Sequence, residues 1–423
     1  MSNMSNQLLF INGQYYQVIQ QESNFINGVT NNYYNKNPIN NNTNYNLIHN
    51  NNYNEKYFSI NRNPENVNQY NINNIPQIKI ENNFLNNISM NPQKISYNKK
   101  PCGIINYGNN CYLNSGLQIL ATCELFIQEL GKYKGIKSCL FDFLKEAFYK
   151  LLNEEIYDPI NFLIYFCKLN NENIKTQYCS QNFIRNLLKK LNDELITNGD
   201  IHLINEYQLY KPKNQFENEK YINFITLNNY FPESNAFKLF SGITKNHSYG
   251  DCKNCKEYNE EISFNYFIDQ IIYLDHIPNK CKFSTILFEN IGKLNNLIIN
   301  CKRCRKEIEI KEETKFIKLP EILIFTLERY QGPTNDAEII PDEIIYMSNY
   351  VDASINLKKL EYELFAINIR FGKTKDFGHE ICQVKRNDKW FEINDQSVEP
   401  ISYERTFVYN NNSYGLFYKR KLK

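Results

Sequence analysis

Three stretches in the middle of the chain place apolar residues three and four positions apart. They are residues 113–130, 137–156 and 181–196. This spacing brings the apolar side chains to one face of a helix. We therefore expect a helix in each of the three stretches.

Beyond about residue 225 the pattern changes to short runs that are rich in aromatic and β-branched residues, as is typical of strands. The expected strands are residues 238–246, 260–274, 319–330, 362–372, 380–386, 389–395 and 413–421. Helices followed by strands predict an α+β fold.

Residues 1–98 show no sustained helical or strand-like spacing of apolar residues, and Asn and Tyr dominate their composition. Such a segment buries too little apolar surface to offset the entropy lost on ordering, so we expect it to be disordered. Its composition favours weak self-association. The alternative, which we prefer, is a coding bias without function. The globular part is then residues 99–423.

Charge and length narrow the class of protein. The 423 residues include 48 basic and 46 acidic ones, a net charge of +2. This balance gives no reason to expect nucleic acid or an anionic membrane as a partner. No signal segment or apolar run of membrane-spanning length is visible. A protein of the cytoplasm, the nucleus or both is expected, and its 12 cysteines then favour metal or catalytic roles over disulfides.

Two Cys-x-x-Cys pairs, Cys252 with Cys255 and Cys301 with Cys304, predict a metal site. Two such turns supply four thiolates, which complete the tetrahedral sphere of Zn²⁺ and leave no position for a substrate. The zinc site is therefore expected to be structural; the alternative is four unrelated cysteines. The remaining cysteines show no such pairing and are interpreted as ordinary core or surface residues: Cys102, Cys123, Cys139, Cys167, Cys179, Cys281 and Cys382.

Cys111 follows a turn rich in Gly and Asn and precedes the first apolar helix pattern. A position at a helix N-terminus favours the thiolate, because unpaired N–H groups and the helix dipole point at it. Gly108 permits a close backbone approach, and the Asn106 amide is a possible donor to an oxyanion. Cys111 is thus a candidate nucleophile, with a buried inert thiol as the alternative.

A cysteine nucleophile needs a base, and His379 is the best candidate among five histidines. It opens a strand-like run, and the next run ends at Asn394 and Asp395, where a group orienting the imidazole would lie. The alternative is a surface-loop histidine. The other histidines lie in the N-terminal segment or in polar or mixed surroundings: His49, His202, His247 and His276.

Residues 103–120 resemble the cysteine box of the ubiquitin-specific proteases, which are papain-like deubiquitinating enzymes. The matching residues are Gly103, Asn106, Gly108, Asn109, Cys111, Tyr112, Asn114, Ser115, Leu117, Gln118 and Leu120. Residues 362–398 are similar to the histidine box of that family, and residues 319–330 and 413–421 are similar to two of its strands. The Cys-x-x-Cys pairs fall between the boxes, as in the family. The resemblance extends from about residue 100 to 423.

The resemblance implies a papain-like fold with a helical thumb at about residues 100–225, zinc-ribbon fingers at about 246–318, and an antiparallel β palm in the remainder of residues 99–423. It implies hydrolysis of the isopeptide or peptide bond after the C-terminal glycine of ubiquitin. Ubiquitin and ubiquitinated proteins would be the partners of a monomeric enzyme.

The resemblance also assigns roles within the site. Cys111 would attack the carbonyl, and His379 would take the thiol proton and later protonate the leaving amine. Asn394 would orient His379, with Asp395 as the alternative or assisting group. Asn106 and nearby backbone N–H groups would stabilise the oxyanion.

Four positions depart from the family pattern. After Gln181 the chain has Asn182 and Arg185 where the family has Asp and Glu, which contact arginines of the ubiquitin tail. Either the tail is held differently, or belongs to a ubiquitin-like modifier, or this helix is misaligned. Glu380 replaces an aromatic residue. Its carboxylate would raise the imidazolium pKa, contact a basic tail, or be solvated. Arg370 stands where the family commonly has His.

These departures motivate a second hypothesis, a catalytically weak ubiquitin-binding scaffold. A zinc-ribbon nucleic-acid module is a third, which the balanced charge and the two boxes disfavour.

Overall fold

The computed structural model divides the chain into two units, Met1–Asn66 and Val67–Lys423. It describes residues 8–11, 14–17, 100–133, 139–153, 155–202, 210–228, 232–275, 277–330, 334–355, 360–374 and 377–421. In the first unit, two short strands that the sequence did not predict, β1 (Leu8–Ile11) and β2 (Gln14–Gln17), pair antiparallel. The rest of residues 1–98 lies outside the described residues, so the disorder expected there stays a prediction.

The helices of the second unit come first in the chain, as predicted. They are α2 (Cys111–Thr122), α3 (Glu124–Leu130), α4 (Cys139–Leu152), α5 (Ile160–Leu169), α6 (Ser180–Thr197), α7 (Gln215–Asn228) and α8 (Asn235–Lys238). The single helix expected over 113–130 is two helices, because Cys123 adopts an extended backbone with ψ of 91°. The expected helices over 137–156 and 181–196 correspond to α4 and α6.

The strands of the second unit follow in the chain, most of them within two main sheets. They are β3 (Gly242–Asp251), β4 (Tyr258–Phe267), β5 (Asp269–Tyr273), β6 (Lys280–Lys282), β7 (Asn295–Asn300), β8 (Glu307–Lys318), β9 (Ile322–Glu328), β10 (Glu338–Ile340), β11 (Ile344–Tyr346), β12 (Glu361–Phe371), β13 (His379–Arg386), β14 (Lys389–Asn394), β15 (Ser397–Ile401) and β16 (Ser413–Arg420). Between them lie α9 (Phe283–Leu287), a π-helix η4 (Phe288–Gly292) and two 3₁₀ turns, η5 (Met347–Asn349) and η6 (Glu404–Phe407).

An eight-stranded sheet runs in the order β15-β14-β13-β12-β16-β9-β5, with β11 added beside β12. Its pairs are antiparallel, with the exception of β5 and β9, which are parallel. The palm is therefore an antiparallel sheet with one parallel edge. β6 and β10 form a separate small parallel pair.

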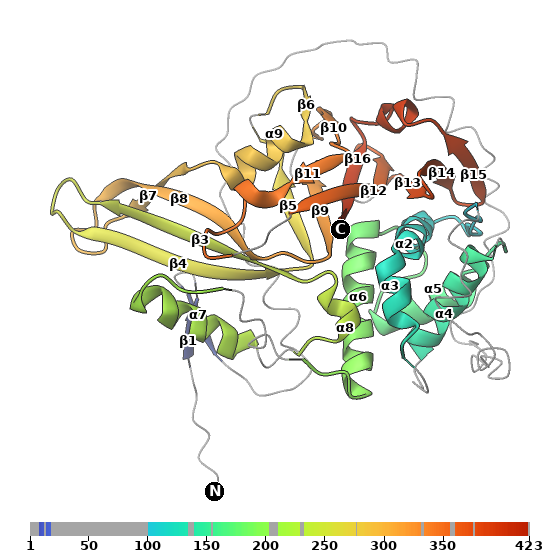
Figure 1. Cartoon of the computed structure of the whole chain (residues 1–423), viewed down its shortest axis with the longest axis horizontal. Helices are drawn as coiled ribbons and strands as arrows, with labels where there is room; N and C mark the ends of the chain where they lie inside the picture. Colours follow the sequence, from blue (N-terminus) through green and yellow to red (C-terminus); the bar gives the residue numbers. More distant parts are fainter. Residues whose placement is uncertain are drawn as a thin grey trace, which may run out of the picture. The chain divides into compact units, whose positions relative to one another are not determined.

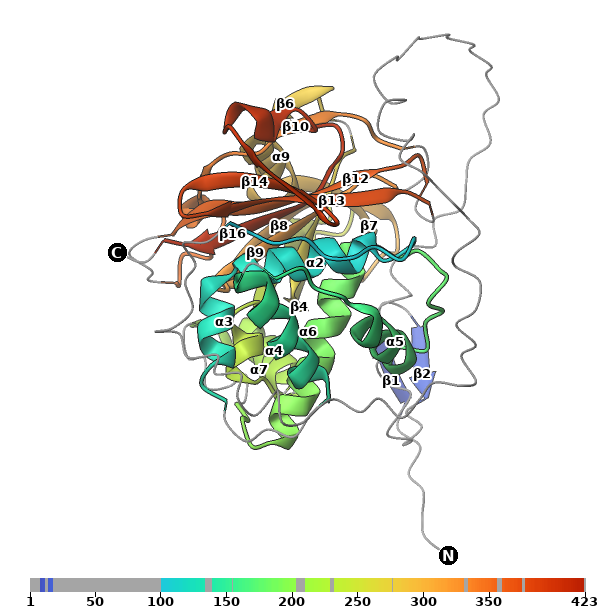
Figure 2. The same cartoon turned by 90° about the vertical axis from the view of Figure 1, so that its right-hand side faces the viewer.

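Each face of this sheet has its own apolar core, because successive side chains of a strand point to opposite faces. On β13, Cys382 and Val384 belong to the core shared with α2 to α6, whereas Ile381 belongs to the core shared with α9. Figure 2 shows α2 between the sheet and the helices α3 to α6. The sheet is thus covered on both sides.

α2 is the central helix of this arrangement and lies against β13. Every residue of α2 is buried. A Cβ at Gly116 would lie 2.5 Å from the ring of Phe183 on α6, so glycine permits the close approach of the two helices. α2, which begins with the candidate nucleophile Cys111, is therefore packed between the eight-stranded sheet and α6.

A second, four-stranded antiparallel sheet has the order β4-β3-β8-β7. Its strands extend away from α2 to α6 (Figure 1). α7 packs on β4. Lys245 on β3, 1% exposed, pairs with Glu217 of α7 and with Asp352, which fixes that helix to the sheet. Together with the Cys₄ cluster described below, these layers confirm the predicted thumb, palm and fingers class; the domain borders stay predictions.

Candidate active site

Cys111 begins α2, as the sequence predicted, and its side chain is 2% exposed. The preceding turn contains Gly108 at φ of 112°, a conformation in which glycine is unstrained. The Gly108 N–H donates to Oδ1 of Asn106 at 2.7 Å. The turn therefore fixes the Asn106 amide at the entrance to the helix.

The expected lowering of the Cys111 pKa is wrong for this structure. The pKa of the thiol is raised from 9.0 to about 12, chiefly by burial and to a smaller extent by the charges of Glu380 and Asp395. A backbone hydrogen bond from Glu380 lowers it, but by less. Desolvation of a thiolate at 2% exposure outweighs the favourable end of a helix dipole.

His379 and Asn394 form the contact that the sequence predicted. Nε2 of His379 lies 2.7 Å from Oδ1 of Asn394. The two residues stand at the ends of β13 and β14, which pair antiparallel. Because the backbone of Glu380 hydrogen-bonds to Cys111, the first residues of β13 lie beside the thiol. The sheet thus brings the imidazole and its orienting amide to the start of α2.

Asp395, which the sequence analysis named as an alternative group for orienting the imidazole, contacts two asparagine side chains. Its carboxylate accepts from Nδ2 of Asn106 at 2.6 Å and from Nδ2 of Asn114 at 2.8 Å. Its backbone carbonyl accepts from the N–H of Ile104 at 2.9 Å. Asp395 therefore orients the candidate oxyanion donor, while Asn394 contacts the imidazole.

Gln177 is a residue of the site that the sequence did not reveal. Its Nε2 donates to Sγ of Cys111 at 3.6 Å and also to the carbonyl of Gly378. Its Oε1 accepts from the N–H of Gly378 at 3.1 Å. Gln177 lies outside both sequence boxes, and no spacing links it to Cys111, so no pattern signalled it.

Glu380 and Arg370 form a buried ion pair, which contradicts two of the alternatives for Glu380, a solvated side chain and a contact with a basic tail. The two are cross-strand neighbours on β13 and β12, and their side chains are 0% and 1% exposed. Glu380 also accepts from the N–H of Ser180 at 3.0 Å and from Nδ2 of Asn368 at 3.2 Å. Because its carboxylate is buried and hydrogen-bonded within the protein, Glu380 is neither solvated nor accessible to a substrate tail.

Arg185 on α6 pairs with Asp269 on β5 through two contacts, at 2.8 and 2.7 Å. Arg185 also donates to Oδ1 of Asn182 at 2.9 Å, and Asp269 accepts from Thr326 at 2.7 Å. Burial opposes ionisation of Asp269, but the guanidinium outweighs it and lowers the pKa of that carboxyl. Arg185 carries a positive charge where the family has a Glu, and the Asp269 carboxylate within the protein balances this charge.

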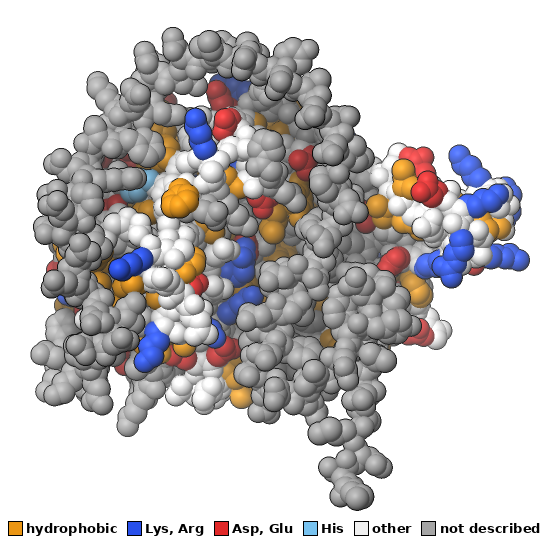
Figure 3. Space-filling view, turned by 180° about the vertical axis from the view of Figure 1, so that it is seen from behind, with side chains coloured by type: hydrophobic (Ala, Val, Ile, Leu, Met, Phe, Trp, Pro, Cys, Tyr) orange, Lys and Arg blue, Asp and Glu red, His pale blue; other side chains and the backbone are white. Residues whose placement is uncertain are grey.

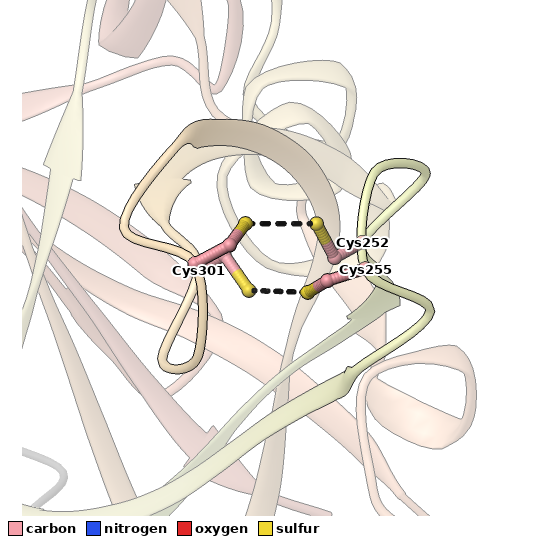
Figure 4. A group of neighbouring side chains, drawn as sticks. Cys252, Cys255 and Cys301 are labelled. Carbon is pink, nitrogen blue, oxygen red and sulfur yellow. Dashed lines mark hydrogen bonds between the residues drawn. The ribbon is translucent and has the colours of Figure 1, made fainter.

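The four predicted metal ligands lie together at the end of the four-stranded sheet. The Sγ atoms of Cys252 and Cys304 are 3.6 Å apart, as are those of Cys255 and Cys301 (Figure 4), and all four sulfurs lie within 4.8 Å of one another. A tetrahedral ion with metal–sulfur bonds of about 2.3 Å needs sulfurs about 3.8 Å apart. The four thiols could therefore hold a metal ion.

The two Cys-x-x-Cys turns share one geometry. Lys256 N–H donates to the Cys252 carbonyl at 2.8 Å, and Arg305 N–H donates to the Cys301 carbonyl at 3.0 Å. Both donors have φ of 60°. Lys and Arg side chains gather at this end of the sheet (Figure 3). The exposed ones are Lys253, Lys256, Lys302, Arg303, Arg305 and Lys306.

The remaining histidines do not join the site. His202 contacts Asp200 at 3.1 Å and His247 contacts Glu260 at 2.9 Å. His49 and His276 lie outside the described residues. Among the described residues, no helix is both long enough and apolar enough to cross a membrane.

Comparison with known proteins identifies the family of the chain. The family model described as ubiquitin carboxyl-terminal hydrolase matches residues 102–418. The probable ubiquitin carboxyl-terminal hydrolase 4 of Schizosaccharomyces pombe is 26% identical over 381 residues, covering 78% of this chain and 61% of that protein. Ubiquitin carboxyl-terminal hydrolase 4 of Arabidopsis thaliana is 26% identical over 346 residues, covering 74% and 89%.

A solved structure has the same fold. It is the SAGA Ubp8/Sgf11/Sus1/Sgf73 DUB module bound to ubiquitin aldehyde, with a TM-score of 0.56 and 20% identity, covering 76% of this chain and 70% of that one. The chain spans 61% of the length of the Schizosaccharomyces pombe relative and most of the Arabidopsis thaliana one.

Proposed function

The chain belongs to the ubiquitin carboxyl-terminal hydrolase family, and from this premise we propose that it is a thiol-dependent deubiquitinase. It would hydrolyse the isopeptide or peptide bond after the C-terminal glycine of ubiquitin, on ubiquitin and ubiquitinated proteins. The observation that carries the proposal is the His379–Asn394 contact, together with the backbone hydrogen bond from the neighbouring Glu380 to the thiol that begins α2. The names of the relatives favour this function over a scaffold without activity.

In the proposed mechanism, His379 removes the proton of the Cys111 thiol, and the sulfur attacks the carbonyl carbon of the terminal glycine. Asn394 accepts a hydrogen bond from the imidazole and fixes its orientation. The imidazolium then protonates the leaving amine. Water, deprotonated by His379, hydrolyses the thioester and restores the thiol.

Asn106 is proposed as the oxyanion donor, together with backbone N–H groups near Cys111. An amide nitrogen carries two hydrogens. Asn106 can therefore hold the Asp395 carboxylate with one and donate the other to the oxyanion. Asp395 is then a positioning residue that acts through Asn106 and not through the imidazole.

We also propose that the metal is Zn²⁺, held by Cys252, Cys255, Cys301 and Cys304. Four thiolates complete the coordination sphere, so the ion would join the ends of β3 and β8 without contacting substrate. The Nδ2 of Asn259 donates to Sγ of Cys301 at 3.7 Å, which supports a thiolate there. An intracellular, monomeric enzyme of the cytoplasm, nucleus or both completes the proposal.

The function is tested with a substrate panel. Purified enzyme is given ubiquitin and ubiquitin-like modifiers, each carrying a fluorogenic C-terminal amide. We expect kcat/KM for ubiquitin to exceed that for every other modifier by at least about tenfold, which is a difference of about 1.4 kcal/mol in transition-state binding. Preference for another modifier would show that the enzyme acts on a ubiquitin-like protein and not on ubiquitin. Absence of turnover on the whole panel would contradict a hydrolase.

Removing the metal should destabilise the protein. A chelator such as phenanthroline is expected to lower the melting temperature by about 5–10 °C, because metal binding contributes directly to folding free energy. Calorimetry gives the melting temperature, and mass spectrometry gives the zinc content. Cys301→Ser should lose the zinc, whereas Cys281→Ser, at a cysteine outside the cluster, should retain it. A metal-free protein that melts at the original temperature would contradict a structural role.

A further inference from the structure

The amide of Gln177 covers the nucleophile. All of its polar groups are engaged: Nε2 donates to Sγ of Cys111 and to the carbonyl of Gly378, and Oε1 accepts from the Gly378 N–H at 3.1 Å. Three hydrogen bonds that involve both the nitrogen and the oxygen hold the amide in one orientation. It lies between the start of α2 and the residue before His379.

This position conflicts with catalysis. Attack requires a substrate carbonyl carbon about 3–3.5 Å from the nucleophile. Nε2 of Gln177 already lies 3.6 Å from Sγ, and Cys111 is 2% exposed. The thiol and the space next to it are therefore closed to a substrate until side chains move.

The contacts of Gln177 also show what can replace it. Its side-chain amide pairs with both backbone groups of Gly378, as a peptide of a neighbouring strand would do. A peptide near the end of the substrate's tail carries the same donor and the same acceptor. It can take over both hydrogen bonds, so that the exchange leaves no buried group unpaired.

We propose that Gln177 closes the site over Cys111 in the free enzyme, and that the tail of the substrate displaces it by pairing with the backbone of Gly378. The inference rests on the proposed function for the identity of the tail, but not for the closure itself. Gln177 then sets part of the affinity for substrate, because every bound tail must first displace its amide.

Two variants separate the closure from other roles of Gln177. Gln177→Met keeps a side chain of similar length without the hydrogen bonds, and Gln177→Ala removes the side chain. The first measurement is the rate of alkylation of Cys111 by iodoacetamide, followed by mass spectrometry of the peptide that contains Cys111. This reagent needs no ubiquitin-binding surface. We expect both variants to react about tenfold faster than the wild type.

The second measurement is steady-state hydrolysis of a ubiquitin C-terminal amide. We expect KM to fall about tenfold in both variants while kcat is kept, because the tail no longer has to displace the amide. Gln215→Ala provides the matched control. Gln215 is an exposed glutamine on α7, and its replacement should leave both rates unchanged.

The outcomes are distinguishable. A lower kcat with an unchanged alkylation rate would mean that Gln177 acts on the transition state, and it would overturn the closure. Unchanged rates in folded variants would overturn it as well. Faster alkylation without any hydrolysis of ubiquitin by either variant or wild type would support the closure and refute the proposed substrate.

Discussion

Replacing Cys111 with alanine is expected to lower kcat/KM on a ubiquitin C-terminal amide by at least about 10⁴-fold. The change removes the protein atom that forms the covalent bond to the substrate carbonyl carbon in the proposed mechanism. The residual rate would come from the oxyanion donors and from substrate positioning. A single-turnover fluorescence assay with enzyme in excess over substrate measures the remaining activity.

Two further variants test whether Cys111 and His379 act as one unit. His379→Ala alone, and the double replacement with Cys111→Ala, should each cost about as much as Cys111→Ala, because members of one catalytic unit are not additive. Ubiquitin binding should survive in all three. Retention of more than about a tenth of the activity in Cys111→Ala would contradict the assignment of the nucleophile.

The second large effect is expected on stability. Replacing Glu380 with alanine should lower the free energy of unfolding by about 3–5 kcal/mol, because the Arg370 guanidinium would remain buried without its carboxylate. Both side chains are at most 1% exposed, so solvent cannot compensate the charge. The chain has one tryptophan, Trp390, on β14 of the same sheet and 4% exposed. Its fluorescence during urea unfolding therefore reports on the palm.

A double replacement gives the matched control for this experiment. Changing Arg370 and Glu380 together to methionine removes both charges and keeps apolar volume, which is often neutral or stabilising at a buried pair. The double variant should therefore be more stable than Glu380→Ala. If Glu380→Ala alone costs less than about 1 kcal/mol, the pair is not the buried interaction described above.

The sequence was most informative where function imposes a local pattern. The box around Cys111, the two Cys-x-x-Cys turns and the run from His379 to Asn394 each indicated a site whose parts the structure brings together. The general order, helices first and strands later, was equally readable, although α7, β7 and β8 were not among the expected elements. α5 escaped prediction because its ten residues, INFLIYFCKL, are nearly all apolar, and only Asn161 and Lys168 mark its exposed face.

Contacts between distant residues were beyond the reach of these patterns. Arg185 and Asp269 are 84 residues apart, and the sequence around each of them contains no pattern that predicts their contact. The predicted direction of the shift in the Cys111 pKa was wrong for a related reason. A helix start can be read from local residues, whereas the burial that opposes the thiolate depends on β13, more than two hundred positions later.

The long separation between the parts of the site has a consequence for the time at which activity begins during protein synthesis. Asn114 on α2 and the Asp395 carboxylate that it contacts are 281 residues apart. A ribosome that adds about 5–20 residues per second needs roughly 15–60 s to cover that distance. β16, which lies between β12 and β9 in the sheet, is made later still. A nascent chain therefore carries the Cys111 thiol long before it carries His379, so the hydrolase activity proposed above would start only as translation of this domain ends.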